Sequence, residues 1–247
     1  MLFLTARQSV QTCVLSRRWR NLWCSMPCLN IDQREFDTAV SSAMGDPKVW
    51  ECGRFEEFVS NLVLKFHSAS SLDMFRCHAT HRCQFEVVDR WIRHGIKCSP
   101  AVMEISWSPH VFFFGLPNSG STACRLKRLH LARIALDTGF TQQLCSGCPV
   151  LEDLQLETCL LDSAEIRSHS LKSLIVTDCT SHFGTVLTIT APALVSFHLA
   201  IGTSTSGSKW RSVIVNEMPS LVEASIRLKS PDESCKLFCS LVYVRIL

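Results

Sequence analysis

The stretch from Leu151 to Leu156 reads Leu-Glu-Asp-Leu-Gln-Leu, and its pattern L-x-x-L-x-L returns along the chain. The last two apolar positions alternate with polar residues, as expected for a strand that buries one face. Successive copies start 20 to 27 residues apart, so the chain carries an internal repeat. The other copies start at Leu126 and Leu171 and, in looser form, at Val102, Leu194 and Leu221.

A repeat of this length built on this phrase predicts a leucine-rich-repeat solenoid. Each phrase should form one strand, and the strands should stack into a parallel sheet because each repeat buries its leucines only against its neighbours. The return segments are irregular or helical. The expected fold class is α/β, a right-handed solenoid with a parallel β-sheet on its concave face. Such a fold offers a long exposed face, which favours binding over catalysis.

Strand alternation also predicts which side chains face away from the core. In the copy from Arg128 to Ala132, Leu129 and Leu131 face inward, whereas Arg128, His130 and Ala132 face outward. The candidate contacts to a protein target on this concave face are Arg128, His130, Asp153, Gln155, Glu157, Ser173, Thr177 and His198. Their charges are mixed and indicate no charge class of target, and the two histidines are interpreted first as ordinary exposed residues.

Two cysteines occupy a position that the repeat pattern reserves for a small residue. Cys159 and Cys179 each lie three residues after the last apolar position of their phrase. Leucine-rich repeats place asparagine or cysteine there, at the inner turn. Both cysteines are therefore expected to be structural.

The composition predicts a folded chain with little chemistry of its own. The 247 residues are 47% hydrophobic and 19% charged, with a net charge of +3. So weak a positive charge does not indicate nucleic acid or an anionic membrane as a partner. No apolar run approaches the roughly 18 residues of a membrane span, and the start is a poor signal peptide. Reduced thiols and a location in the cytoplasm, the nucleus or both are expected.

No catalytic or metal-binding motif emerges from the sequence. No phosphate loop, dinucleotide fingerprint or G-x-S-x-G elbow is present. The pair Cys145 and Cys148 has CxxC spacing, and Cys77, His78, His81 and Cys83 lie close together along the chain. Structural zinc usually needs two properly spaced pairs, and a second CxxC is missing. We therefore expect no metal, no cofactor and no enzyme activity.

The first thirty residues predict two short amphipathic helices. Val10, Cys13 and Val14 share one helix face, and the apolar face shifts near Ser16, which is a candidate cap for a second helix. The second stripe consists of Leu15, Trp19, Leu22, Trp23 and Met26. Pro27 should end this helix. An ordinary helical cap of the solenoid would show the same spacing.

This segment resembles a known family. Residues 12–23 read Thr-Cys-Val-Leu-Ser-Arg-Arg-Trp-Arg-Asn-Leu-Trp, which is similar to the second half of an F-box in plant F-box/LRR-repeat proteins of the F-box/FBD/LRR type. The phrase from Cys148 to Leu156 is similar to the repeats of the same family. The resemblance implies docking on the Skp-type adaptor of a cullin-based ubiquitin ligase. It implies these adaptor-binding residues: Val10, Val14, Leu15, Trp19 and Leu22.

The resemblance also implies an incomplete domain set. A full F-box starts with a leucine-proline-aspartate phrase and a first helix, which have no counterpart here, and an FBD domain is not seen at the other end. The expected organisation is a partial F-box over 1–30, a linker over 31–54 and repeats over 55–247, irregular before 100 and truncated at the C-terminus. Helices are expected from Phe55 and from Phe85, the latter ending at Gly95.

The expected function is that of the substrate-recognition subunit of an SCF-type cullin–RING E3 ubiquitin ligase, which binds a protein target through the repeats. The alternative is a leucine-rich-repeat interaction scaffold without a working link to a ligase. The two differ in whether the partial F-box holds the adaptor.

Overall fold

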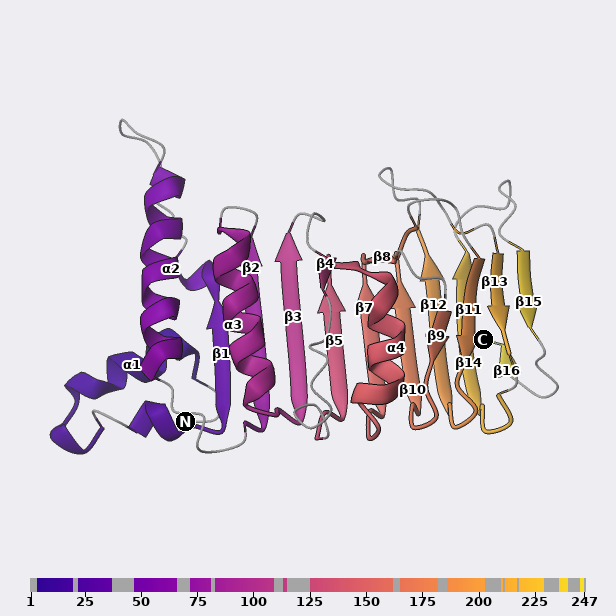
Figure 1. Cartoon of the computed structure of the whole chain (residues 1–247), viewed down its shortest axis with the longest axis horizontal. Coiled ribbons are helices and arrows are strands. Elements are labelled where there is room, and N and C mark those ends of the chain that lie inside the picture. The colour runs from indigo at the N-terminus through magenta and orange to yellow at the C-terminus, as the bar shows by residue number, and fades with distance from the viewer. Residues whose placement is uncertain are drawn as a thin grey trace. The chain divides into compact units, whose positions relative to one another are not determined.

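A computed structural model describes the chain over residues 4–19, 22–36, 47–65, 72–80, 83–108, 113–114, 125–161, 165–181, 186–202, 210, 212–216, 218–228, 236–239 and 245–246. The chain divides into two compact units, Met1–Ser108 and Pro109–Leu247. Helices lie between the parallel strands of the first unit, whereas the described part of the second unit consists mainly of parallel strands (Figure 1). The fold is α/β and of the leucine-rich-repeat type, as the sequence predicts.

The first unit combines a short helical segment with three parallel strands. Its strands pair in the order β1-β2-β3, with α2 and α3 in the connections between them. The elements are α1 (Ala6–Gln11), the 3-10 turns η1 (Thr12–Val14), η2 (Arg17–Trp19) and η3 (Leu22–Ser25), β1 (Cys28–Asp32), the 3-10 turn η4 (Gln33–Glu35), α2 (Pro47–Lys65), β2 (Met74–Thr80), α3 (Phe85–Lys97) and β3 (Val102–Ser108).

Aromatic residues form the centre of this unit. The rings of Phe55 on α2 and Trp91 on α3 meet edge to face, with centroids 5.4 Å apart. Phe75 of β2 is fully buried, and its ring lies against Gly95 of α3. A Cβ atom at Gly95 would stand 2.6 Å from that ring, so the sequence needs glycine there for close approach of helix and strand.

The second unit is built from stacked repeats. Its main sheet has the order β5-β7-β10-β12-β14-β16, and a second parallel sheet, β15-β13-β11-β9, forms in the return segments. A three-stranded sheet runs β4-β6-β8. The elements are β4 (Phe113–Phe114), β5 (Arg128–Ala132), β6 (Ala135–Leu136), α4 (Thr138–Gly147), β7 (Asp153–Glu157), β8 (Leu160–Leu161), β9 (Glu165–Arg167), β10 (Ser173–Thr177), β11 (Val186–Thr190), β12 (Ser196–Ile201), β13 (Ser212–Val215), β14 (Glu223–Leu228), β15 (Lys236–Cys239) and β16 (Arg245–Ile246).

The predicted strand register is confirmed. Each phrase of the repeat contributes one strand of the main sheet, and its apolar residues form the core. In the four copies that start at Leu126, Leu151, Leu171 and Leu194, all three apolar positions are at most 2% exposed. In the copy that starts at Leu221, the third position is only half-buried.

A repeated turn follows three of these strands. Arg133, Thr158 and Asp178 have φ values of 59°, 52° and 51°, the left-handed conformation. Their backbone N–H groups donate to carbonyl oxygens on the next strand over 2.8, 2.7 and 2.8 Å, respectively. The unusual backbone is therefore compensated by a hydrogen bond that ties each repeat to the next.

Cysteines fill the inner side of two of these turns, as predicted. The thiol of Cys159 donates to the carbonyl oxygen of Leu131 over 3.3 Å, and that of Cys179 donates to the carbonyl oxygen of Leu156 over 3.5 Å. Both side chains are buried. Each small thiol fits the turn and satisfies a carbonyl of the preceding repeat.

Three details of the sequence prediction need correction. Strand β1 and helix α2, which starts at Pro47, occupy parts of the expected linker 31–54. Gly95 lies inside α3, which continues to Lys97. The second N-terminal helix is replaced by the 3-10 turns η2 and η3. Because 3-10 and α-helices both bring residues i and i+3 together, the apolar spacing did not distinguish them.

Candidate functional site

The N-terminal segment, residues 5–26, forms a compact helical hook. Thr5 caps α1: its hydroxyl accepts from the Gln8 N–H over 3.3 Å, and the Gln8 side chain accepts from the Thr5 N–H over 3.2 Å. Trp23 and Met26 are buried and anchor the end of the hook. The sequence therefore specifies a defined start and a buried end for this segment.

The middle of the hook exposes large apolar side chains. Val14 is 88% exposed, Leu15 68% and Trp19 36%. These are three of the five predicted adaptor-binding residues. Of the other two, Val10 is half-buried, and the side chain of Leu22 lies outside the described part of the chain. Neighbouring exposed apolar residues of this size are typical of a protein contact surface.

Contacts with the η4 turn and the adjoining Phe36 fix the hook to the rest of the first unit. The Thr5 hydroxyl donates to a carboxylate oxygen of Glu35 over 2.8 Å, and Arg7 donates to the Glu35 backbone carbonyl. The Arg7 guanidinium lies 4.7 Å from the centre of the Phe36 ring. Phe36 in turn packs on Phe55, with ring centroids 5.3 Å apart. The hook is thus part of the folded unit.

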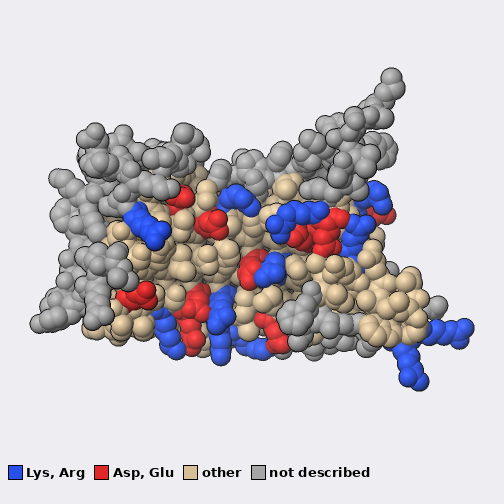
Figure 2. Space-filling view, turned by 180° about the vertical axis from the view of Figure 1, so that it is seen from behind, with Lys and Arg blue, Asp and Glu red and all other residues tan. Residues whose placement is uncertain are grey.

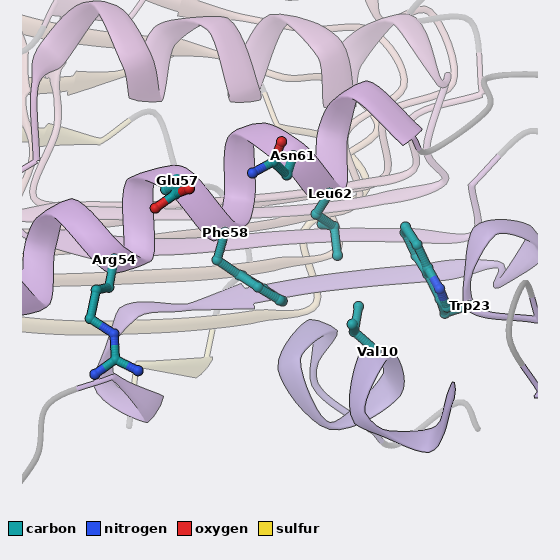
Figure 3. Close-up of a pocket in the computed structure, with 7 residues that line it drawn as sticks. All are labelled: Val10, Trp23, Arg54, Glu57, Phe58, Asn61 and Leu62. Atoms are coloured by element: carbon teal, nitrogen blue, oxygen red, sulfur yellow. The ribbon is translucent and has the colours of Figure 1, made fainter. Parts of the chain in front are cut away.

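An open cleft of about 270 Å³ separates the hook from α2. Figure 3 shows Phe58 and Leu62 reaching from α2 toward Val10 of α1, with Trp23 beside them. The polar side chains that complete the lining are those of Arg54, Glu57 and Asn61. The sequence predicted the helix around Phe58 and Leu62 from its spacing. It gave no signal that this helix would face the hook.

The outward face of the main sheet in the second unit carries the predicted target-binding residues. Register pairing aligns them in three rows across the strands: Arg128, Asp153, Ser173, Ser196 and Glu223; His130, Gln155, Ile175, His198 and Ser225; and Ala132, Glu157, Thr177, Ala200 and Arg227. All are exposed or half-buried except Ala132, which is 7% exposed. Ala132 occupies the outward register position that strand alternation predicts, and its short methyl group is little accessible there.

Charged side chains on this face compensate one another. Nε of Arg128 lies 2.9 Å from a carboxylate oxygen of Asp153, its register partner. Nε2 of His130 lies 3.5 Å from a carboxylate oxygen of Glu157 on the neighbouring strand, a contact that is an ion pair only when the imidazole is protonated. Figure 2 shows acidic and basic side chains interspersed over the described part of the face that it draws, rather than gathered by sign. The face therefore offers no strong field of one sign.

The central part of this face is almost free of charge. The outward residues of β10 and β12 are hydroxyl-bearing or apolar, apart from His198. Charged residues flank them on β7 and β14, namely Asp153, Glu157, Glu223 and Arg227. A contact centred here would depend on shape and hydrogen bonds more than on ion pairs.

Three of the buried thiols have little nucleophilic character. Burial raises the pKa of Cys77 to about 12 and also raises the pKa of Cys98 and of Cys179. A thiol must ionise to attack a substrate or bind a metal. These three cysteines are therefore protonated at neutral pH and act as small core residues.

The described residues give no sign of a metal site. No group of three or more His, Cys, Asp or Glu side chains among them is placed to hold an ion. Cys148 of the CxxC pair is buried in the repeat core, whereas the side chain of Cys145 and all of His81 fall outside the described part. Within the same part, no helix is long and apolar enough to cross a membrane.

Comparison with known proteins agrees with this architecture. The model of a family described as "FBD-associated F-box protein At5g56370, LRR repeats" matches residues 105–223, which include four of the regular repeats. No solved structure shows a significant match to the chain.

Several plant proteins are similar to the chain over nearly its whole length. The MEIOTIC F-BOX protein MOF of Oryza sativa subsp. japonica is 32% identical over 237 residues, which are 93% of this chain and 49% of that protein. The putative FBD-associated F-box protein At5g56440 of Arabidopsis thaliana is 27% identical over 96% of this chain and 58% of its own length. The Arabidopsis F-box/FBD/LRR-repeat protein At1g78750 is 27% identical over 92% of this chain and 54% of its own length.

These matches, together with the hook and the stacked repeats, assign the chain to the plant F-box/LRR-repeat proteins. Within that class it is similar to the FBD-associated group. The chain spans about half the length of the curated relatives it matches.

Proposed function

We propose that the chain acts as the substrate-recognition subunit of an SCF-type cullin–RING E3 ubiquitin ligase. In this role the hook binds a Skp-type adaptor and the outward face of the repeats binds a protein target. The chain catalyses no reaction itself; it holds the target near the transferring subunits, and its contribution is proximity. It acts in the cytoplasm, the nucleus or both.

One observation supports this proposal most strongly. Val14, Leu15 and Trp19 are exposed on a segment whose two ends are held in place, by Thr5 and Arg7 at one end and by buried side chains at the other. Apolar residues on a preorganised segment lose little conformational freedom on binding, so they suit a protein contact. The plant relatives are named F-box proteins, which supports the same role for the hook.

Binding of the full chain to a purified Skp-type adaptor tests the proposal. Isothermal titration calorimetry should detect a complex with the wild-type chain. The variant Leu15→Ser should weaken binding at least tenfold because it removes an exposed apolar contact without touching the core. Val222→Ser is the matched control, since Val222 is 70% exposed but lies in the second unit.

The same measurement of adaptor binding distinguishes the two expected functions. A wild-type chain that does not bind the adaptor contradicts the ligase role and leaves the alternative, an interaction scaffold that binds a target without a ligase. Equal loss of binding in Leu15→Ser and Val222→Ser would also contradict the role assigned to the hook.

A further inference from the structure

The cleft between the hook and α2 has the size and lining of a pocket for one apolar side chain. Its volume of about 270 Å³ lies below the roughly 300–1,000 Å³ typical of pockets for drug-sized ligands. Phe58 and Leu62 on one side face Val10 on the other, and Trp23 lies beside them (Figure 3). Such pockets commonly hold the buried anchor residue of a protein partner.

The hook has an unusual charge distribution. Residues 1–31 contain four arginines and neither aspartate nor glutamate; the first acidic residue is Asp32. Arg17 and Arg18 are exposed on η2, and Arg54 is exposed at the cleft. Within the part of the chain that the structure describes, none of these three forms an ion pair. Glu57 is the acidic residue in the cleft lining.

We propose that this cleft is the second part of the adaptor interface: it receives one apolar side chain of the partner, and Arg54 in its lining favours a partner surface that is acidic beside that side chain. The inference rests on the proposed ligase role of the hook. It adds α2 to the interface, with Phe58 and Leu62 as contacts, and it specifies the chemistry of the partner.

The position of the cleft beside the exposed part of the hook, and the charge of its lining, support an apolar side chain of the adaptor as its occupant. Val10, which lines the cleft, and Val14, which is exposed, lie four residues apart at the end of the same helical segment, so one partner surface can reach both. An exposed arginine beside an apolar pocket, such as Arg54, attracts an acidic partner surface and accelerates encounter, with an effect that salt weakens. The apolar anchor supplies the contact that salt does not weaken.

Two variants test the inference with the full chain and a purified Skp-type adaptor in calorimetry. Val10→Phe places a larger side chain in the cleft and should weaken binding at least tenfold, with an unchanged melting temperature. Arg54→Glu should weaken binding severalfold at low salt, and the difference should shrink at high salt. Arg54 is exposed, so its replacement does not endanger folding. Lys97→Glu, an exposed residue of α3, is the control for the same charge change.

The outcomes distinguish this inference from the proposed function. If the wild-type chain binds and both Val10→Phe and Arg54→Glu bind as tightly as Lys97→Glu, the cleft is not part of the interface and the inference is overturned, whereas the ligase role stands. If the wild-type chain does not bind the adaptor at all, the proposed function and the inference are both overturned.

Discussion

Nε of Arg128 lies 2.9 Å from a carboxylate oxygen of Asp153, directly across the boundary between two neighbouring repeats. The two side chains are 69% and 40% exposed, so water screens their attraction. The pair aligns two repeats on the candidate target face without burying charge.

The charge reversal Arg128→Glu should destabilise the chain by less than about 1 kcal/mol, because exposed pairs of this kind contribute only about 0.2–1 kcal/mol. Urea unfolding would measure the change. The double variant Arg128→Glu with Asp153→Arg should recover most of the loss. A loss of several kcal/mol, or no recovery in the double variant, would show that the pair has a different structural role.

Thr158→Asn should stabilise the chain by about 1 kcal/mol. Thr158 has φ 52°, which is costly for a β-branched residue, whereas asparagine adopts this conformation more readily. The N–H donated to Thr177 is retained in the variant. Thr177→Asn, in the extended strand β10, is the control and should not stabilise. Equal unfolding midpoints for Thr158→Asn and the wild type would argue against strain at this turn.

Replacing two helical glycines with alanine should change the stability of the chain in opposite directions. Gly95→Ala should cost about 1–3 kcal/mol because its Cβ would meet the Phe75 ring at 2.6 Å. Gly53→Ala in α2 should stabilise the chain by about 0.5–1 kcal/mol, because an added Cβ would meet no described atom within 4 Å beyond its own helix backbone and chain neighbours, and because glycine weakens a helix interior. Thermal unfolding of both variants measures this. A double-mutant cycle with Phe75→Leu should show coupling to Gly95 only.

Alkaline pH should destabilise the chain through its buried thiols. The pKa of Cys77 is raised by burial from the ordinary 9.0 to about 12. The unfolded chain therefore releases this proton at lower pH than the folded chain does. Its stabilising contribution is complete below pH 9 and is lost as the pH rises toward 12, by up to about 1.4 kcal/mol per pH unit. Urea unfolding at pH 8, 9 and 10 should show a shallower decline for Cys77→Ala. Parallel declines in both chains would contradict the prediction.

Much of the repeat architecture was predictable because its signals are local. The recurrence of the phrase around Leu154 and Leu156 indicates the period of the repeat. The alternation within the phrase indicates which face of the strand each residue occupies. The same alternation located Arg128 and Glu157 on the outward face. It also placed Ala132 on that face, but the low exposure of Ala132 depends on the packing around it, which alternation does not indicate.

The hook was predictable only in part. Its apolar residues and its likeness to an F-box were evident from residues 12–23, but its path was not. Contacts of Thr5 and Arg7 with residues about thirty positions away decide how it sits on the first unit. Such contacts leave no periodic trace in the sequence.

By itself, the sequence determined the strand register, the family and the residues of the candidate target face, because side-chain alternation and repeat length are properties of neighbouring residues. The tertiary structure alone decided the left-handed turn at Thr158, the glycine contact of Gly95 with Phe75 and the cleft that joins Val10 to α2. Each of these depends on groups far apart in the chain, which meet only after the repeats have stacked and the hook has docked.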